Sequence, residues 1–139
     1  MHVLILGSGG REHAIAWKIA KSSSCNKLFI APGNAGTEEI GTNINIDVND
    51  FDSIKQLVLK EKIEIVIVGP EDPLVNGISD FFKANDALKD IVIIGPCKKG
   101  AQLEGSKEFA KHFMQRHNIP TAKYQAFNKN TLKQGYDYL

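Results

Sequence analysis

The sequence is poor in cysteine: its 139 residues include only Cys25 and Cys97, which are far apart. They form no C-x-x-C pair, so a disulfide scaffold and a zinc site are both disfavoured. Long hydrophobic runs are also lacking, because no stretch approaches the about 20 apolar residues that a membrane-spanning helix needs. We therefore expect reduced thiols and a cytoplasmic location, with no membrane partner.

An excess of charge of one sign is lacking too, since the formal net charge is +1. This excludes a general attraction to nucleic acid. The charge is nevertheless uneven: residues 1–96 carry 9 basic and 13 acidic side chains, whereas residues 97–139 carry 8 basic and 3 acidic ones. The shift predicts a boundary between two modules near Cys97. A solvated, lysine-rich helix and loop would produce the same shift, and this alternative stays open.

Short apolar runs rich in valine and isoleucine recur along the first hundred residues. They are continuous rather than alternating, which is typical of strands buried on both faces of a parallel sheet. The first run has no basic leader before it, so we interpret it as a strand rather than a signal peptide. The runs cover residues 2–6, 27–31, 64–68 and 91–95, with a weaker one at 43–46.

The segments between these runs place apolar residues at helical spacing. Alternation of strands and helices predicts right-handed crossovers and an α/β fold, namely a Rossmann-like open parallel sheet with helices on both faces. The expected helices cover residues 11–21, residues 51–61 with Asp50 as the N-cap, and residues 74–83.

Beyond residue 96 the pattern changes. We expect a short helix, a break at Gly105, and a longer helix over 106–117 that Ser106 caps. Pro120 disfavours continuation of that helix. Residues 122–127, "AKYQAF", resemble an edge strand, and residues 128–139 complete no structural unit.

The stretch "GSGGREH", residues 7–13, follows the first apolar run directly. A glycine-rich turn between a buried strand and a helix directs backbone amides at a phosphate. The dinucleotide fingerprint G-x-G-x-x-G fails here, because Glu12 stands where its third glycine belongs and no acidic residue ends the second run. Residues 100–107, "GAQLEGSK", imitate a P-loop, but serine and lysine are exchanged and no strand precedes them.

What remains is a helix start preceded by glycines, with Arg11 adding a charged fork. Residues 31–37, "APGNAGT", and residues 68–74, "VGPEDPL", form two more polar loops at the same edge of the predicted sheet. Three such loops suit a small phosphorylated, hydroxylated ligand. Glu12 and Glu71 either face outward or contact a ribose or an amine. In the alternative interpretation, the glycines only form tight turns.

These motifs, followed by "GAQLEGSKEFAK" and "NIPTAKYQAF", make the chain resemble the phosphoribosylamine–glycine ligase (glycinamide ribonucleotide synthetase) family of the ATP-grasp superfamily. The resemblance covers essentially the whole chain. It implies an ATP-dependent C–N ligase of de novo purine biosynthesis that joins glycine to 5-phosphoribosylamine through glycyl phosphate, giving glycinamide ribonucleotide, ADP and phosphate. It also implies a Rossmann-like, substrate-binding N-terminal domain of the pre-ATP-grasp type over residues 1–100, followed over residues 101–139 by the incomplete beginning of an ATP-grasp domain.

The resemblance further implies which residues bind ligands. Lys107 corresponds to a lysine that reaches the phosphates of ATP, although an ordinary exposed lysine is the alternative. No residue is assigned to catalysis, and no spacing indicates a metal site. The residues expected to bind the sugar substrate are Gly9, Gly10, Arg11, Glu12, Asn34, Ala35, Gly36, Thr37, Pro70 and Glu71.

The chain is much shorter than members of this family. The ATP-clamping sheets and the acidic ligands of Mg²⁺ or Mn²⁺ would follow Leu139, in the remainder of the same chain. We therefore expect this piece to be inactive alone and to hold no ATP or metal by itself. A stand-alone regulatory module that binds a sugar phosphate or a nucleotide remains the alternative, and an NAD-dependent oxidoreductase lacks its motif.

Overall fold

The computed structural model describes residues 1–138 and divides the chain into two compact units, Met1–Ala101 and Gln102–Leu139. The first unit contains the sheet, whereas the regular structure of the second unit is helical. Among residues 1–138, no helix combines the length and apolar character required to cross a lipid bilayer.

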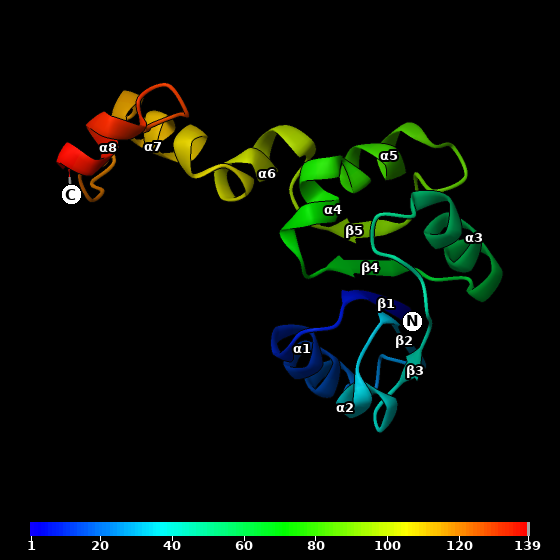
Figure 1. Ribbon diagram of the computed structural model, residues 1–139. Helices are drawn as coiled ribbons and strands as arrows, with labels where there is room; N and C mark the ends of the chain where they lie inside the picture. The colour runs from blue at the N-terminus through cyan, green and yellow to red at the C-terminus, as the bar shows by residue number, and fades with distance from the viewer. Residues whose placement is uncertain (139) are drawn as a thin grey trace. The chain divides into compact units, whose positions relative to one another are not determined.

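The first unit is built on a five-stranded parallel sheet in the order β3-β2-β1-β4-β5 (Figure 1). The chain forms β1, continues outward to β2 and β3, and then crosses back to place β4 on the other side of β1. The topological switch point therefore lies between β1 and β4. The strands are β1 His2–Gly7, β2 Lys27–Pro32, β3 Thr42–Asn43, β4 Ile65–Val68 and β5 Val92–Ile94.

Helices lie on both faces of this sheet, which confirms the predicted α/β class (Figure 1). Two helices cover one face near β1 and β2, and three helices cover the opposite face. The first group is α1 Gly10–Ala20 and α2 Ala35–Glu38, and the second is α3 Phe51–Glu61, α4 Glu71–Asn76 and α5 Ile78–Ala84.

The central strand β1 shows why its apolar run is continuous. Leu4 and Leu6 pack into the core beneath α3, α4 and α5. Val3 and Ile5 point the other way and pack into the core beneath α1. All four side chains are buried, because successive residues of a strand face opposite sides and helices cover both.

The edge strand β5 departs from this pattern. Ile65 pairs with Val92 and Ile67 with Ile94 in parallel register, so these four side chains point to the same face of the sheet. This is the face on which α1 packs over β1 and β2. Val92 is 55% exposed and Ile94 is 51% exposed. The expectation of burial on both faces is thus correct for β1 and wrong for β5.

Asp50 caps α3 as predicted. Its carboxylate accepts hydrogen bonds from the Ser53 hydroxyl, at 2.6 Å, and from the Ser53 backbone N–H, at 3.1 Å. These bonds hold the pKa of Asp50 below its ordinary value, the hydroxyl contributing most. Asp50 thus stabilises the start of α3 in its ionised form, and this support is lost as the pH falls through its pKa.

The single helix predicted over 74–83 is wrong, because two short helices, α4 and α5, meet there at Gly77. Gly77 has a φ of 99°, in the left-handed region that ends helices. The apolar spacing of the segment continues across the break, so hydrophobic periodicity did not reveal it.

The second unit begins within α6 and has the helix break predicted near Gly105. The Ser106 hydroxyl accepts a hydrogen bond from the Phe109 N–H at 3.2 Å, which confirms the cap. The edge strand expected over 122–127 is wrong, because no strand lies among the described residues of this unit to pair with it. The helices are α6 Lys98–Gly105, α7 Lys107–Arg116 and α8 Leu132–Tyr138.

The break at Gly77 leads to a stability prediction. A Cβ at Gly77 would lie 3.5 Å from its nearest neighbour, Lys98 Cδ, so an alanine fits and only its backbone conformation is strained. We expect Gly77→Ala to lower the free energy of unfolding by about 1–2 kcal/mol. Urea unfolding followed by Trp17 fluorescence measures this, since Trp17 is the single tryptophan and belongs to the first unit.

Gly10→Ala is the matched control, because Gly10 is helical and a Cβ there meets nothing within 4 Å. It should leave the free energy of unfolding unchanged or raise it by about 0.5–1 kcal/mol. If Gly77→Ala and Gly10→Ala lowered the free energy of unfolding equally, a conformational role for Gly77 would be contradicted.

Candidate functional site

A cleft of about 470 Å³ opens at the carboxyl ends of the strands, where the strand order reverses. Open α/β sheets bind ligands at such a switch point. Three of its walls come from the turns after β1, β2 and β4, and the fourth is the segment that crosses from β3 to α3. The lining residues are Gly7, Ser8, Gly9, Glu12, Pro32, Asn45, Ile46, Asp47, Val48 and Pro70.

The start of α1 provides the wall that attracts anions. Gly9 is the N-cap residue, with an extended backbone, and the helix begins at Gly10. Ser8, Gly9 and Gly10 are all exposed. The first N–H groups of a helix find no acceptor within it, and the helix dipole adds positive potential there. The turn after β1 is therefore suited to a phosphate or carboxylate.

Glu12 is buried immediately beneath this turn, with 5% of its surface exposed. One carboxylate oxygen accepts a hydrogen bond from the Gly9 N–H at 2.8 Å. The other accepts one from Arg11 Nε at 3.0 Å, which also forms an ion pair. The outward-facing alternative for Glu12 is therefore wrong: its carboxylate holds the turn together from inside.

Three glycines border the Glu12 side chain. A Cβ at Gly7 would lie 2.6 Å from Glu12 Cγ, one at Gly9 would lie 2.8 Å from Oε2, and one at Gly69 would lie 2.5 Å from Cγ. Any larger residue would displace the carboxylate. In a dinucleotide fold the glycines let the backbone approach a pyrophosphate. Here they make room for a glutamate, which explains why the fingerprint breaks at residue 12.

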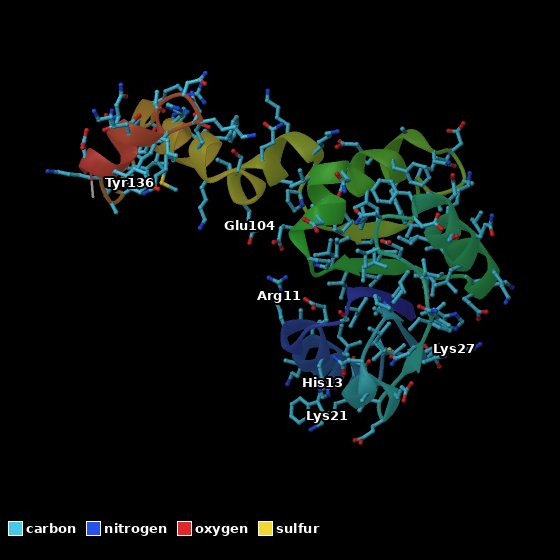
Figure 2. The ribbon with its side chains drawn as sticks, viewed as in Figure 1. Arg11, His13, Lys21, Lys27, Glu104 and Tyr136 are labelled. Carbon is cyan, nitrogen blue, oxygen red and sulfur yellow. The ribbon has the colours of Figure 1, made fainter. Side chains whose placement is uncertain are left out.

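Arg11 connects the turn after β1 to the end of β4. Figure 2 shows it extending from the start of α1 toward that strand. Its Nε contacts Glu12, and its Nη2 donates a hydrogen bond to the carbonyl oxygen of Gly69. The side chain is 60% exposed. Arg11 therefore both braces the two loops and brings a positive charge beside the helix start.

The loop after β2 forms a closed hydrogen-bond network. Thr37 is fully buried, and its hydroxyl accepts a bond from the Asn34 N–H at 2.8 Å and lies 2.7 Å from Asn43 Oδ1. Asn34 accepts the Thr37 N–H in return, at 3.1 Å, and so caps α2. The Asn34 amide also donates to the carbonyl oxygen of Ser8 at 2.8 Å. Through this bond to Ser8, the loop after β2 holds the turn after β1 in position.

None of the four predicted residues in this region lines the cleft; they are Asn34, Ala35, Gly36 and Thr37. A Cβ at Gly36 would lie 2.8 Å from His13 Nδ1, so the glycine lets α2 pack against α1. Ala35 is exposed at the start of α2.

The remaining predicted residues fall in different places. Pro70 lines the cleft, whereas Glu71 is exposed in the first turn of α4 and does not line it. Lys107 is exposed at the start of α7 in the second unit. Within residues 1–138, no group of three or more His, Cys, Asp or Glu side chains is arranged to hold a metal ion.

One wall of the cleft, residues 45–48, was not predicted from the sequence. These residues follow β3, which comprises only Thr42 and Asn43. The strand predicted from the weak apolar run at 43–46 is therefore wrong beyond Asn43. A signal was available, because the polar Asn45 and Asp47 follow β3 at the same edge of the sheet as the glycine turns. The run was too short to indicate where the chain would cross.

Comparison with known proteins identifies the family to which the chain belongs. Residues 1–104 match the model of the family described as "Phosphoribosylglycinamide synthetase, N domain". This chain belongs to that family. Among curated proteins, it is 50% identical over 131 residues to the phosphoribosylamine–glycine ligase of Haemophilus influenzae, and equally so to that of Escherichia coli K12. It is 51% identical over 127 residues to the ligase of Fusobacterium nucleatum.

Each alignment covers 91–93% of this chain but only 29–30% of the relative. The chain therefore spans about a third of the length of the ligases that it matches. The stretch that belongs to the phosphoribosylglycinamide synthetase family includes the whole cleft.

Two solved structures are similar to this chain over nearly its whole length. The phosphoribosylamine–glycine ligase of Thermotoga maritima superposes with a TM-score of 0.65 at 34% identity, covering 99% of this chain and 30% of that one. The N5-carboxyaminoimidazole ribonucleotide synthetase of Thermus thermophilus superposes with a TM-score of 0.64 at 17% identity, covering 98% and 36%. The second likeness shows a shared fold.

The contact between Gly69 and Glu12 can be tested with a double-mutant cycle. We expect Gly69→Ala to lower the free energy of unfolding by about 1–3 kcal/mol, because the new methyl group overlaps the carboxylate. In a Glu12→Ala background the overlapping atoms are absent, so the same change should cost much less. Urea unfolding of the four proteins measures the coupling.

Gly41→Ala provides the control, since a Cβ there would overlap Ile30 and Leu28 instead. Gly41→Ala should lower the free energy of unfolding by the same amount in the wild-type and the Glu12→Ala backgrounds. If Gly69→Ala were equally damaging with and without the Glu12 side chain, the carboxylate would not be what requires the glycine.

Proposed function

We propose that this chain forms the sugar-phosphate side of the active site of a phosphoribosylamine–glycine ligase, a cytoplasmic enzyme of purine biosynthesis. In this proposal the complete ligase joins glycine to 5-phosphoribosylamine with ATP. The observation that carries the proposal is the cleft at the switch point, with an exposed helix start as one wall. Membership of the family supports the same reaction.

The cleft suits the phosphate group of such a substrate. Ser8 and Gly9 line the cleft at the turn before α1, where the Ser8 side chain is exposed. The exposed Gly10 next to them begins α1 and brings the backbone amide of the first helical residue to this turn. The Arg11 guanidinium adds positive charge. Glu12 does not oppose the phosphate strongly, because its carboxylate is buried and already paired with Arg11 and the Gly9 N–H.

The cleft also suits the size of the substrate. Its volume of about 470 Å³ lies within the range of small-molecule sites, about 300–1,000 Å³. Pro32 and Pro70 provide apolar contact from two sides. In this proposal Asn34, Thr37 and Gly36 act on the substrate indirectly, by fixing the position of the turn after β1.

ATP would supply the activation of the glycine carboxylate in the complete ligase. Lys107 is the residue of this chain that we assign to the phosphates of ATP, on the basis of the "GSK" motif and its exposure at the start of α7. On the basis of the resemblance to the ligase family, we assign the ligands of Mg²⁺ or Mn²⁺ to the rest of the ligase. This chain binds and orients the sugar.

The phosphate assignment predicts an effect of charge at Ser8, an exposed residue of the cleft. We expect Ser8→Glu to weaken the binding of ribose 5-phosphate by about 10-fold or more, because a carboxylate would face the phosphate at short range. Ser8→Gln has nearly the same size without the charge, and should weaken binding far less. Isothermal titration calorimetry of the three proteins measures the difference.

Raising the salt concentration should narrow the gap between the glutamate and glutamine variants, because exposed charges are screened. Identical affinities of the two variants at low salt would show that the phosphate binds elsewhere.

The proposal also predicts that the 139-residue chain does not turn over by itself. With ATP, Mg²⁺, glycine and 5-phosphoribosylamine, we expect no release of ADP above the background rate, because the cleft handles only the sugar. The E. coli ligase in the same assay serves as the positive control. ADP release that depends on glycine would refute the proposal that this chain binds only the sugar and needs the rest of the ligase for the reaction.

A further inference from the structure

The cleft has a second polar wall, opposite in chemistry to the start of α1. Most side chains that could contact sugar hydroxyls are already engaged: Glu12 holds the turn after β1, and Asn34 and Thr37 bond to each other. The polar side chains that line the cleft from the β3–α3 crossing are Asn45 and Asp47. Both are exposed.

The backbone holds this crossing segment in place at both ends. At its beginning, the Ile44 N–H donates to the carbonyl oxygen of Ile30 in β2 at 2.8 Å. At its end, the Asp50 N–H donates to the carbonyl oxygen of Asp47 at 3.0 Å. The segment is thus anchored to the sheet on one side and to the start of α3 on the other.

The Asp47 carboxylate is oriented as well as anchored, because its Oδ1 accepts the Asn49 N–H at 2.8 Å. A carboxylate has about four lone-pair sites, so one backbone donor leaves capacity for hydroxyl donors. Such a group repels a phosphate and accepts hydrogen bonds from sugar hydroxyls. The start of α1 has the opposite preference. The two walls together orient a molecule that carries a phosphate at one end and hydroxyls at the other.

We propose that Asp47, with Asn45 beside it, binds the 2-hydroxyl of the pentose and makes the cleft selective for ribose phosphates over 2-deoxyribose phosphates. This inference rests on the proposed function, because it takes the phosphate to bind at the start of α1. It adds a specificity determinant on the β3–α3 crossing, a segment that carries none of the glycine motifs.

The experiment compares ribose 5-phosphate with 2-deoxyribose 5-phosphate by isothermal titration calorimetry on the chain as it stands. Hydrogen bonds to charged groups correspond to about 10- to 100-fold in affinity, so the wild type should prefer ribose 5-phosphate by about 10-fold or more. Asp47→Ala should remove most of this preference, because it weakens the binding of ribose 5-phosphate and leaves the binding of 2-deoxyribose 5-phosphate nearly unchanged. Asp47→Asn keeps an acceptor for the Asn49 N–H, and should lose part of the preference.

Asp52→Asn is the matched control, since Asp52 is an exposed carboxylate on α3 that does not line the cleft. It should bind both sugars as the wild type does. Unfolding followed by Trp17 fluorescence checks that each Asp47 variant is folded. If Asp47→Ala and Asp47→Asn weakened both sugars equally, the residue would serve the shape of the cleft, and the proposed selectivity would be wrong.

The two levels of the proposal fail in different ways. A wild type that binds both sugar phosphates with equal affinity overturns the role of Asp47 and leaves the sugar-phosphate site intact. A wild type that binds neither sugar more tightly than inorganic phosphate overturns the site itself, and the role of Asp47 with it.

Discussion

The site depends on one buried carboxylate. Glu12 lies beneath the turn after β1, accepts the Gly9 N–H and the Arg11 side chain, and occupies the space above Gly69. A charge removed from water is tolerated only when it is paired and hydrogen-bonded, and both conditions are met here. Because Arg11 also bonds to the carbonyl oxygen of Gly69, the same constraint joins the ends of β1 and β4 on either side of the switch point.

The neighbouring loops extend this constraint rather than acting independently. Asn34 connects the loop after β2 to the carbonyl oxygen of Ser8, and Thr37 locks Asn34 in place. These hydrogen bonds fix the backbone of the turn that leads into the exposed start of α1. Rigid support of this kind is what a binding site needs in order to fix the position of a small molecule.

The fold is more widely shared than the chemistry. The carboxyaminoimidazole ribonucleotide synthetase of Thermus thermophilus shares the architecture at 17% identity, whereas the ligase of Thermotoga maritima shares it at 34%. Fold alone does not assign function, and details within the cleft carry it. In the function that we propose for this chain, those details are the start of α1 on one wall and the Asp47 carboxylate on the other.

Sequence patterns determined the parallel sheet and the principal helices, because hydrophobic periodicity and caps such as Asp50 and Ser106 act locally. They also located the glycine turns at one edge of the sheet. Tertiary structure alone decided that Glu12 is buried, that β5 is exposed on one face, and that residues 45–48 complete the cleft. Each of these results depends on which distant segments become neighbours: Glu12 is buried because Gly69 lies against it, and residues 45–48 reach the cleft because the chain crosses β1 to form β4.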